Sequence, residues 1–162
     1  MFEWLESSPY AIWARESLWG WPIALTVHAF GTAVVVGLIF IIGLRLLGVF
    51  RPIPYTALNK LIPIIWFGVI CQVLSGFTLW LTKPAQYMST GMFETKLSLV
   101  VLGIVVTIVF QSVLKRGTAT WEAAGTAPSR GVKVFVVATV VVWAAVLIAG
   151  RLTAYLGSLY TS

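Results

Sequence analysis

The sequence contains little charge, one cysteine and one histidine, and each shortage excludes a class of protein. Charged residues make up 10% of the 162 positions and hydrophobic residues 59%, with a mean hydropathy of +0.96, which is far from the composition of soluble domains. Cys71 has no second cysteine to form a disulfide within the chain. His28 is the only histidine, so the Cys and His spacing of a zinc site is also absent. The composition predicts an integral membrane protein.

The hydrophobic residues are concentrated in four long runs. A helix needs about 20 mainly apolar residues to cross the hydrocarbon core, and it satisfies its backbone polar groups internally. We therefore expect an all-α fold, a four-transmembrane-helix bundle over residues 22–162. The spans are expected at residues 22–47, 61–82, 96–114 and 133–152.

The segment 1–21 is too short and too charged to form another span. Ser8 and Pro9 are typical of the start of a helix, and Gly20 is typical of its end. Aromatic side chains with one polar edge favour the membrane interface, and this segment contains Tyr10, Trp13, Trp19 and Trp21. We expect a short amphipathic helix lying on the outer surface of the membrane.

Basic residues flank two of the three connections between the spans. Those around the first and third connections are Arg45, Arg51, Lys60, Lys115, Arg116, Arg130 and Lys133. Glu122 is the only acid among them, so the positive-inside rule places these connections in the cytoplasm and both termini outside. This distribution explains the net charge of +6 without nucleic-acid binding. Glu3 and Glu6 argue against a cleavable signal peptide, so we expect the N-terminus to be retained.

With this topology, several polar residues fall at one level in the outer leaflet. They are His28, Glu94, Lys96, Arg151 and Tyr155. Ionisable groups at such depths are costly and are candidates for function. A polar stripe at helical spacing climbs the second span towards the same side and consists of Cys71, Ser75, Thr78 and Thr82.

One interpretation of this level is a redox cofactor site. His28 would bind the iron of a b-type haem, while Lys96 and Arg151 pair with its propionates. The second axial ligand is then absent, supplied by Met88 or Met92, or contributed by another copy of the chain. The related alternative is a quinone whose carbonyl accepts hydrogen bonds from His28 and Tyr155. Small neighbours of His28 would allow a flat cofactor or another backbone to approach closely: Ala24, Gly31 and Thr32.

The other interpretation is structural. His28 then bridges helices through hydrogen bonds, and Lys96 and Arg151 extend to the interface. Gln72 is explained by hydrogen bonding between helices, and Arg45 by extension of its side chain to the inner interface. Met88 and Met92 carry thioethers that suit Cu(I), but two sulfur atoms are also ordinary in an interfacial loop. Ala33 with Gly37 predicts a close-packed face on the first helix.

Three stretches carry a resemblance to a family: "SLWGWPIALTVHAFGTAVVVGLIFIIGLRLLG", "MFETKLSLVVLG" and "AGRLTAYLG". They resemble an uncharacterised bacterial family of small four-helix inner-membrane proteins, and more distantly copper-resistance D type proteins and small cytochrome b subunits. The resemblance implies a bacterial inner-membrane location and directs attention to His28, Lys96 and Arg151. Some relatives carry a histidine near the end of the third span, where this chain has Gln111. That difference argues against a haem held by two histidines.

Two functions therefore remain open. The first is a redox membrane subunit that binds haem b or quinone near His28. The second is a non-catalytic scaffold or assembly subunit of a larger membrane complex. In both, we expect the lipid bilayer, further copies of the chain or other membrane subunits as partners. Motifs of soluble enzymes are absent, so we do not expect the chain to be an enzyme on its own.

Overall fold

The protein consists of long helices joined by short connections. The computed structural model describes residues 3–88 and 91–159, with side chains placed for these except 3, 92 and 153–159. Its long helices are α3 (Gly20–Leu47), α4 (Ile62–Thr82), α6 (Gly91–Ala124) and α7 (Arg130–Leu159). With the 3₁₀ helix η1 (Tyr55–Leu61) added to α4, each is long and apolar enough to cross a membrane. The expected all-α fold with four long apolar helices is confirmed, and the described part contains no strand.

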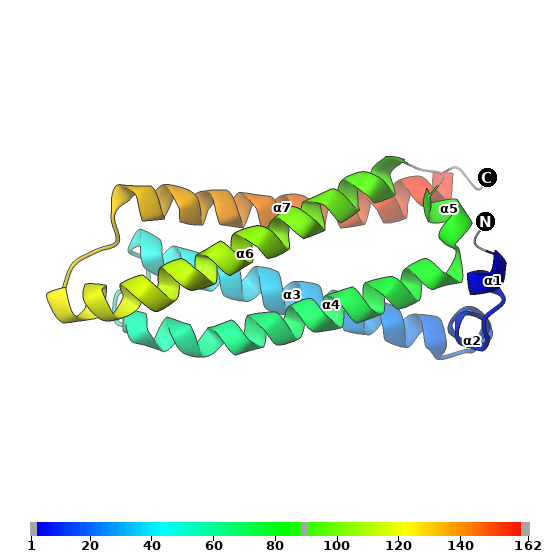
Figure 1. The fold of residues 1–162 in the computed structure, drawn as a ribbon, viewed down its shortest axis with the longest axis horizontal. Coiled ribbons are helices and arrows are strands. Elements are labelled where there is room, and N and C mark those ends of the chain that lie inside the picture. Colours follow the sequence, from blue (N-terminus) through cyan, green and yellow to red (C-terminus); the bar gives the residue numbers. More distant parts are fainter. Residues whose placement is uncertain (1–2, 89–90, 160–162) are drawn as a thin grey trace.

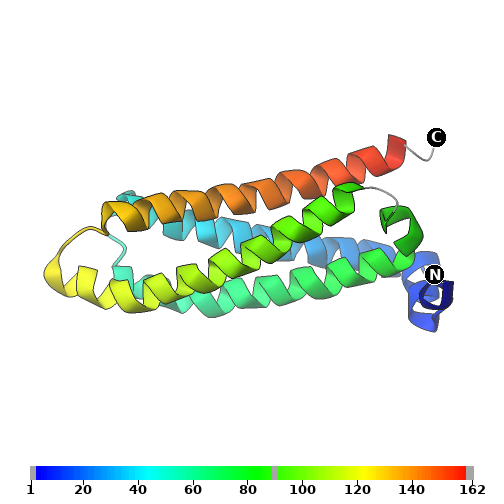
Figure 2. The same cartoon turned by 45° about the horizontal axis from the view of Figure 1, so that its top comes forward.

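The helices run antiparallel to their neighbours along the chain (Figure 1). Close packing pairs α3 with α4 and α6 with α7, and α3 also packs on α7. Helix α6 packs on η1 at one end of the bundle. Towards the other end, Figures 1 and 2 both show α6 diverging from α4, and the short helix α5 (Pro84–Met88) lies in the connection between them.

The structure extends several helices beyond their expected limits. Helix α3 begins at Gly20, with Pro22 in its first turn, where a missing N–H costs nothing. Helix α6 runs past the expected 96–114 at both ends and stops where Gly125 takes a left-handed conformation (φ 59°). The termination signal in the sequence is thus this glycine, eleven residues beyond the last residue of the expected span.

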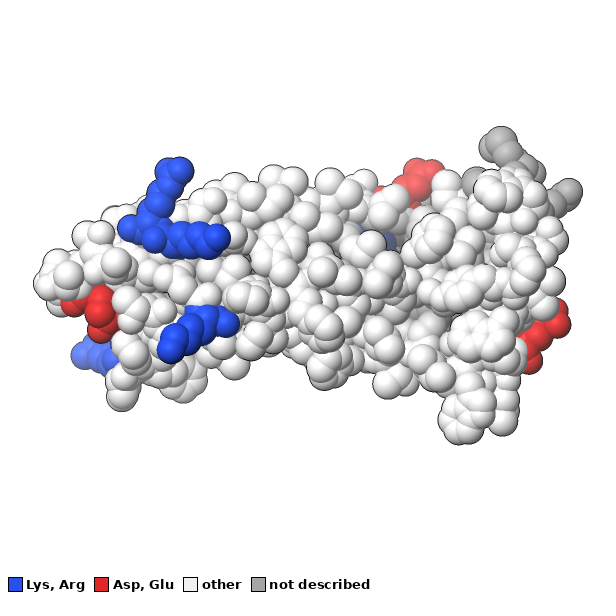
Figure 3. Space-filling view, turned by 60° about the horizontal axis from the view of Figure 1, so that its bottom comes forward, with Lys and Arg blue, Asp and Glu red and all other residues white. Residues whose placement is uncertain are grey.

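The bundle buries an apolar core and leaves large apolar side chains exposed around it. Every long helix contributes to the core, for example Ile39, Ile65, Phe110 and Trp143. Exposed Leu, Ile, Val and Phe residues lie on all four long helices. Such an outer surface is unfavourable in water and suits lipid. On the face drawn in Figure 3, most Lys and Arg side chains gather at one end. A small area of Lys or Arg atoms also lies deeper, among uncharged residues, towards the other end.

We call the end of the bundle that carries η1 the basic end. It holds Arg45, Arg51, Lys60, Lys115, Arg116, Arg130 and Lys133. Arg45 was expected to extend to the interface, but it is buried (6% exposed) beneath the loop that follows α3. Its guanidinium carbon lies 3.8 Å from the centre of the Tyr55 ring, and its Nε donates a hydrogen bond to the Ile53 carbonyl. Glu122 of α6 accepts hydrogen bonds from the backbone N–H groups of Tyr55 and Thr56. These contacts fasten the loop and η1 to α3 and α6.

Two short helices precede α3 at the opposite end, α1 (Glu3–Glu6) and α2 (Pro9–Glu16). The Ser8 hydroxyl accepts a hydrogen bond from the Ala11 N–H (3.2 Å) and caps α2. Gly20 begins the next helix and does not end this one. Figure 1 views α2 nearly end-on, so it lies across the end of the bundle. The Tyr10 and Thr78 hydroxyl oxygens are 2.9 Å apart, which links α2 to α4.

Candidate functional site

His28 lies where α3 and α4 come close together. A side-chain carbon on Gly31 would lie 2.8 Å from the carbonyl oxygen of Gly68, so only glycine allows this approach. The His28 Nδ1 is 3.1 Å from the Ser75 Oγ, and the Nε2 is 3.4 Å from the Gln72 Nε2. Gly31, a small neighbour of His28, therefore lies against another backbone. This is one of the two expectations for the small residues around His28; the other is a flat cofactor.

The partners of His28 define its hydrogen bonds. The amide nitrogen of Gln72 can only donate, so the His28 Nε2 accepts and the Nδ1–H donates to Ser75. The Ser75 hydroxyl then donates to the Cys71 carbonyl. The Thr32 hydroxyl donates to the Gln72 Oε1 (2.7 Å) and thereby orients the amide. We call Thr32, Gln72, His28 and Ser75 the histidine network.

Lys96 of α6 lies beside the histidine network. Its side chain is half-buried and lies against Gly150 of α7, with its Cε 3.7 Å from where a side-chain carbon of Gly150 would lie. The ammonium group is near enough to His28 for a long-range Coulomb interaction between them. Among the described residues, the single ion pair joins Arg15 and Glu16, so no carboxylate is within salt-bridge distance of Lys96.

The structure brings together only part of the expected outer cluster. His28 and Lys96 lie near each other, whereas Glu94 and Arg151 are exposed. The side chains of Tyr155 and Met92 lie outside the described part of the chain. Met88 is exposed at the end of α5.

The polar stripe on α4 supplies partners of His28 and Tyr10 that the sequence did not single out as site residues. Ser75 bonds His28 and Thr78 bonds Tyr10, so the stripe faces α3 and α2. Gln72, expected to bond between helices, does so within the histidine network. The helical spacing of these α4 residues could be seen in the sequence. The sequence did not show which helices they contact.

Other polar residues inside the bundle join helices. The Trp66 Nε1 donates to the Gln111 Oε1 (2.6 Å), which connects α4 to α6. The Trp143 Nε1 donates to the Thr107 Oγ1 (3.0 Å), which connects α7 to α6. Gln111 is therefore engaged in packing, whereas Lys96 carries a charge and has no ion-pair partner in the described part of the chain.

Metal ligands are sparse in the part of the chain with placed side chains. No three His, Cys, Asp or Glu residues there lie close enough together to hold an ion. Comparisons with protein-family models, with curated proteins and with solved structures find no match to this chain.

Proposed function

We propose that the protein is a multi-pass membrane subunit that binds the headgroup of a quinone beside Lys96 and the histidine network. The observation that carries the proposal is that Lys96 is half-buried near His28 and has no ion-pair partner among the described residues. An ammonium group inside a membrane bundle is costly unless it is paired. A quinone supplies the missing partner, because its carbonyl oxygens accept hydrogen bonds and it partitions into lipid.

The residues present suit a ligand that accepts hydrogen bonds. The ammonium group of Lys96 has three N–H donors, and its side chain is held against α7 rather than in water. The Gln72 amide offers a second donor once it releases the His28 Nε2, a contact of 3.4 Å that is long for a hydrogen bond. Lys96 would therefore hold one carbonyl oxygen, and Gln72 would orient the ring.

Haem fits these residues less well. An iron ligand needs a free imidazole nitrogen, but both ring nitrogens of His28 face side chains of α4. The α4 backbone also packs directly against Gly31, one turn from His28, and so fills the space beside this small residue. The proposal therefore favours a hydrogen-bonded ligand over an iron-bound one.

The charge distribution supports an orientation for this site. Seven basic residues and one acidic residue lie at the basic end, which the positive-inside rule assigns to the cytoplasm of a bacterial inner membrane. The histidine network and Lys96 then lie in the outer half of the bilayer, with both termini outside. The position of α2 across the bundle end, with Trp13 and Tyr10 exposed, suits a helix at the outer interface.

Replacing Lys96 by methionine tests the proposal. We expect the affinity for a short-chain benzoquinone, measured by quenching of tryptophan fluorescence in detergent, to fall about 30-fold, which corresponds to one charge-assisted hydrogen bond of about 2 kcal/mol. The control is Lys83→Met, because Lys83 is exposed at the same end of the bundle. Equal affinities in the two variants would exclude Lys96 as the ligand. A Soret band that is lost in His28→Ala would instead establish haem.

The orientation has its own test. Thr126 lies in the connection between α6 and α7 at the basic end. In a Cys71→Ser background, we expect Thr126→Cys to resist membrane-impermeant maleimide in intact cells and to react once the cells are opened. Rapid labelling of intact cells would invert the topology.

Exposed aromatic residues favour a second candidate function, the scaffold. Trp4 is 72% exposed and Trp19 is 67% exposed, and both lie at the end formed by α1 and α2. A partner subunit would cover such side chains. If it does, deleting residues 1–19 should release a protein that co-purifies with the full chain in mild detergent. Unchanged co-purification would leave this candidate without support.

A further inference from the structure

An apolar groove of about 310 Å³ lies between α3 and α7, away from the histidine network. Its lining is entirely apolar and includes Phe40, Val140, Trp143 and Ala144. Phe40 and Ala144 are exposed, so the groove opens onto the outer surface of the bundle. In a membrane, this surface faces hydrocarbon, and an acyl chain is the kind of molecule that fills such a groove.

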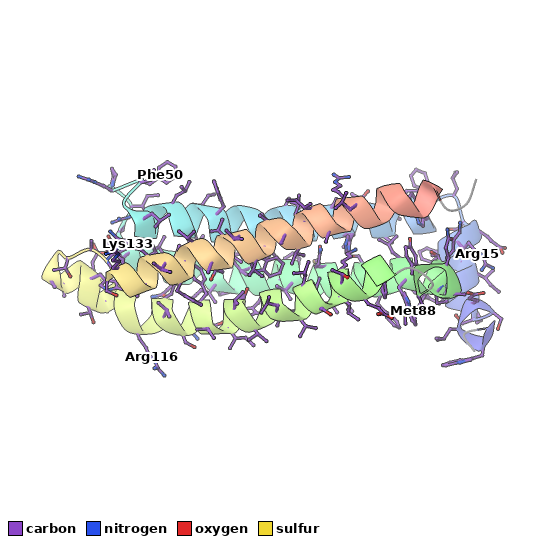
Figure 4. The ribbon with its side chains drawn as sticks, turned by 90° about the horizontal axis from the view of Figure 1, so that it is seen from above. Arg15, Phe50, Met88, Arg116 and Lys133 are labelled. Carbon is purple, nitrogen blue, oxygen red and sulfur yellow. The ribbon has the colours of Figure 1, made fainter. Side chains whose placement is uncertain are left out.

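Positive charge lies at the ends of the same two helices that form the basic end. Arg130 and Lys133 are in the first turn of α7, and Arg51 follows α3. Figure 4 shows Lys133 at the start of α7 on the side of the bundle towards Phe50, whereas Arg116 projects from the opposite side. Glu122, the acidic residue at this end, is engaged with the backbone of η1 and leaves these charges unneutralised.

The spacing between the charges and the groove matches a phospholipid. Val140 is about 10 Å along α7 from Lys133, and Ala144 is about 16 Å from it, at a rise of 1.5 Å per residue. One leaflet of hydrocarbon is about 15 Å deep. An acyl chain whose phosphate lies at the level of Lys133 therefore extends along the groove to about Ala144.

We propose that the α3/α7 groove and the residues Arg51, Arg130 and Lys133 form a binding site for an anionic phospholipid of the leaflet at the basic end. One acyl chain lies against Phe40 and Trp143, and the phosphate lies among the three basic side chains. The two parts recognise different features of the lipid, because the groove takes the hydrocarbon chain and the charges select an anionic headgroup. The site does not depend on quinone binding, which is proposed near the other end of the bundle.

The role of the basic residues in selecting an anionic headgroup is tested by removing two basic residues at a time. The protein is placed in nanodiscs of phosphatidylcholine with added phosphatidylglycerol, and the retained lipids are counted by native mass spectrometry. In Arg130→Gln with Lys133→Gln, we expect the preference for phosphatidylglycerol to fall about fivefold for each charge removed. The control is Lys115→Gln with Arg116→Gln, which removes the same charge from α6. Equal losses in the two double variants would mean that the basic end attracts lipid without a site, and would overturn the proposal.

Substitution of Ala144 tests whether the α3/α7 groove holds an acyl chain. Ala144→Phe fills the groove, while Ala138→Phe adds the same side chain at an exposed position of α7 outside it. We expect Ala144→Phe to lose the retained phosphatidylglycerol and Ala138→Phe to keep it. Retention of this lipid in both variants would show that the groove holds no acyl chain.

Discussion

Gly31→Ala is expected to lower the free energy of unfolding by about 2 kcal/mol, while Gly37→Ala on the same helix leaves it unchanged or raises it. The added methyl group at Gly31 would lie 2.8 Å from the Gly68 carbonyl oxygen and 3.0 Å from the Gln72 backbone nitrogen. Both are backbone atoms, so α3 and α4 must separate to admit it. At Gly37 the same group meets no heavy atom within 4 Å, and alanine favours a helix over glycine by up to about 1 kcal/mol.

Reversible unfolding of the two variants in mixed micelles, followed by circular dichroism, measures this difference. Because the Gln72 backbone lies against Gly31, separation of α3 from α4 also displaces Gln72, which would orient the quinone ring. Gly31→Ala should therefore weaken quinone binding, and Gly37→Ala should not. If both alanine variants unfold like the native protein, α3 and α4 do not pack through Gly31.

Arg45→Met is expected to cost about 3 kcal/mol, from a desolvated cation–π contact of about 2 kcal/mol and a hydrogen bond from a charged donor. Methionine retains much of the aliphatic bulk but neither stacks as a cation on Tyr55 nor donates to the Ile53 carbonyl. Without Arg45, we expect the loop between α3 and η1 to open. Limited proteolysis near Pro52 detects this opening, and chemical unfolding measures its cost.

Arg51→Met is the matched control for that prediction. Arg51 lies in the same loop and carries the same charge, but it is exposed and makes only a long 3.4 Å hydrogen bond to the Gly48 carbonyl. Its removal should cost about 0.5 kcal/mol or less. Similar losses in both variants would show that net charge, and not the burial of Arg45, holds the loop.

The sequence was sufficient for the membrane-spanning architecture because this depends on run length and hydropathy. Which face of each helix packs inward was harder to predict. Helix α3 is apolar on all sides, so it lacks the polar face that orients a helix in water. Ala33 with Gly37 therefore indicated close packing, yet Ala33 is exposed and Gly37 has open space. The close approach occurs at Gly31.

In the candidate site, too, the sequence predicted some features and not others. The shared level of His28 and Lys96 followed from helix rise and direction, and their interaction agrees with it. Arg151 and Glu94 share this level but are exposed, because depth does not determine the side of a helix on which a residue lies. Arg45 was misjudged for another reason. Its partners belong to a loop and to η1, whose folding onto α6 is a long-range contact that no local pattern encodes.

The half-buried position of Lys96 on an apolar helix changes how a lipophilic molecule would reach it. Because large apolar side chains are exposed along α6 after Lys96, for example Leu97 and Val101, a lipophilic ligand would come sideways from the bilayer and not from the aqueous phase. Its occupancy then follows its mole fraction in the lipid and not its bulk concentration. Adding empty vesicles at constant total ligand dilutes the ligand in the membrane, so the apparent Kd should rise in proportion to the lipid volume.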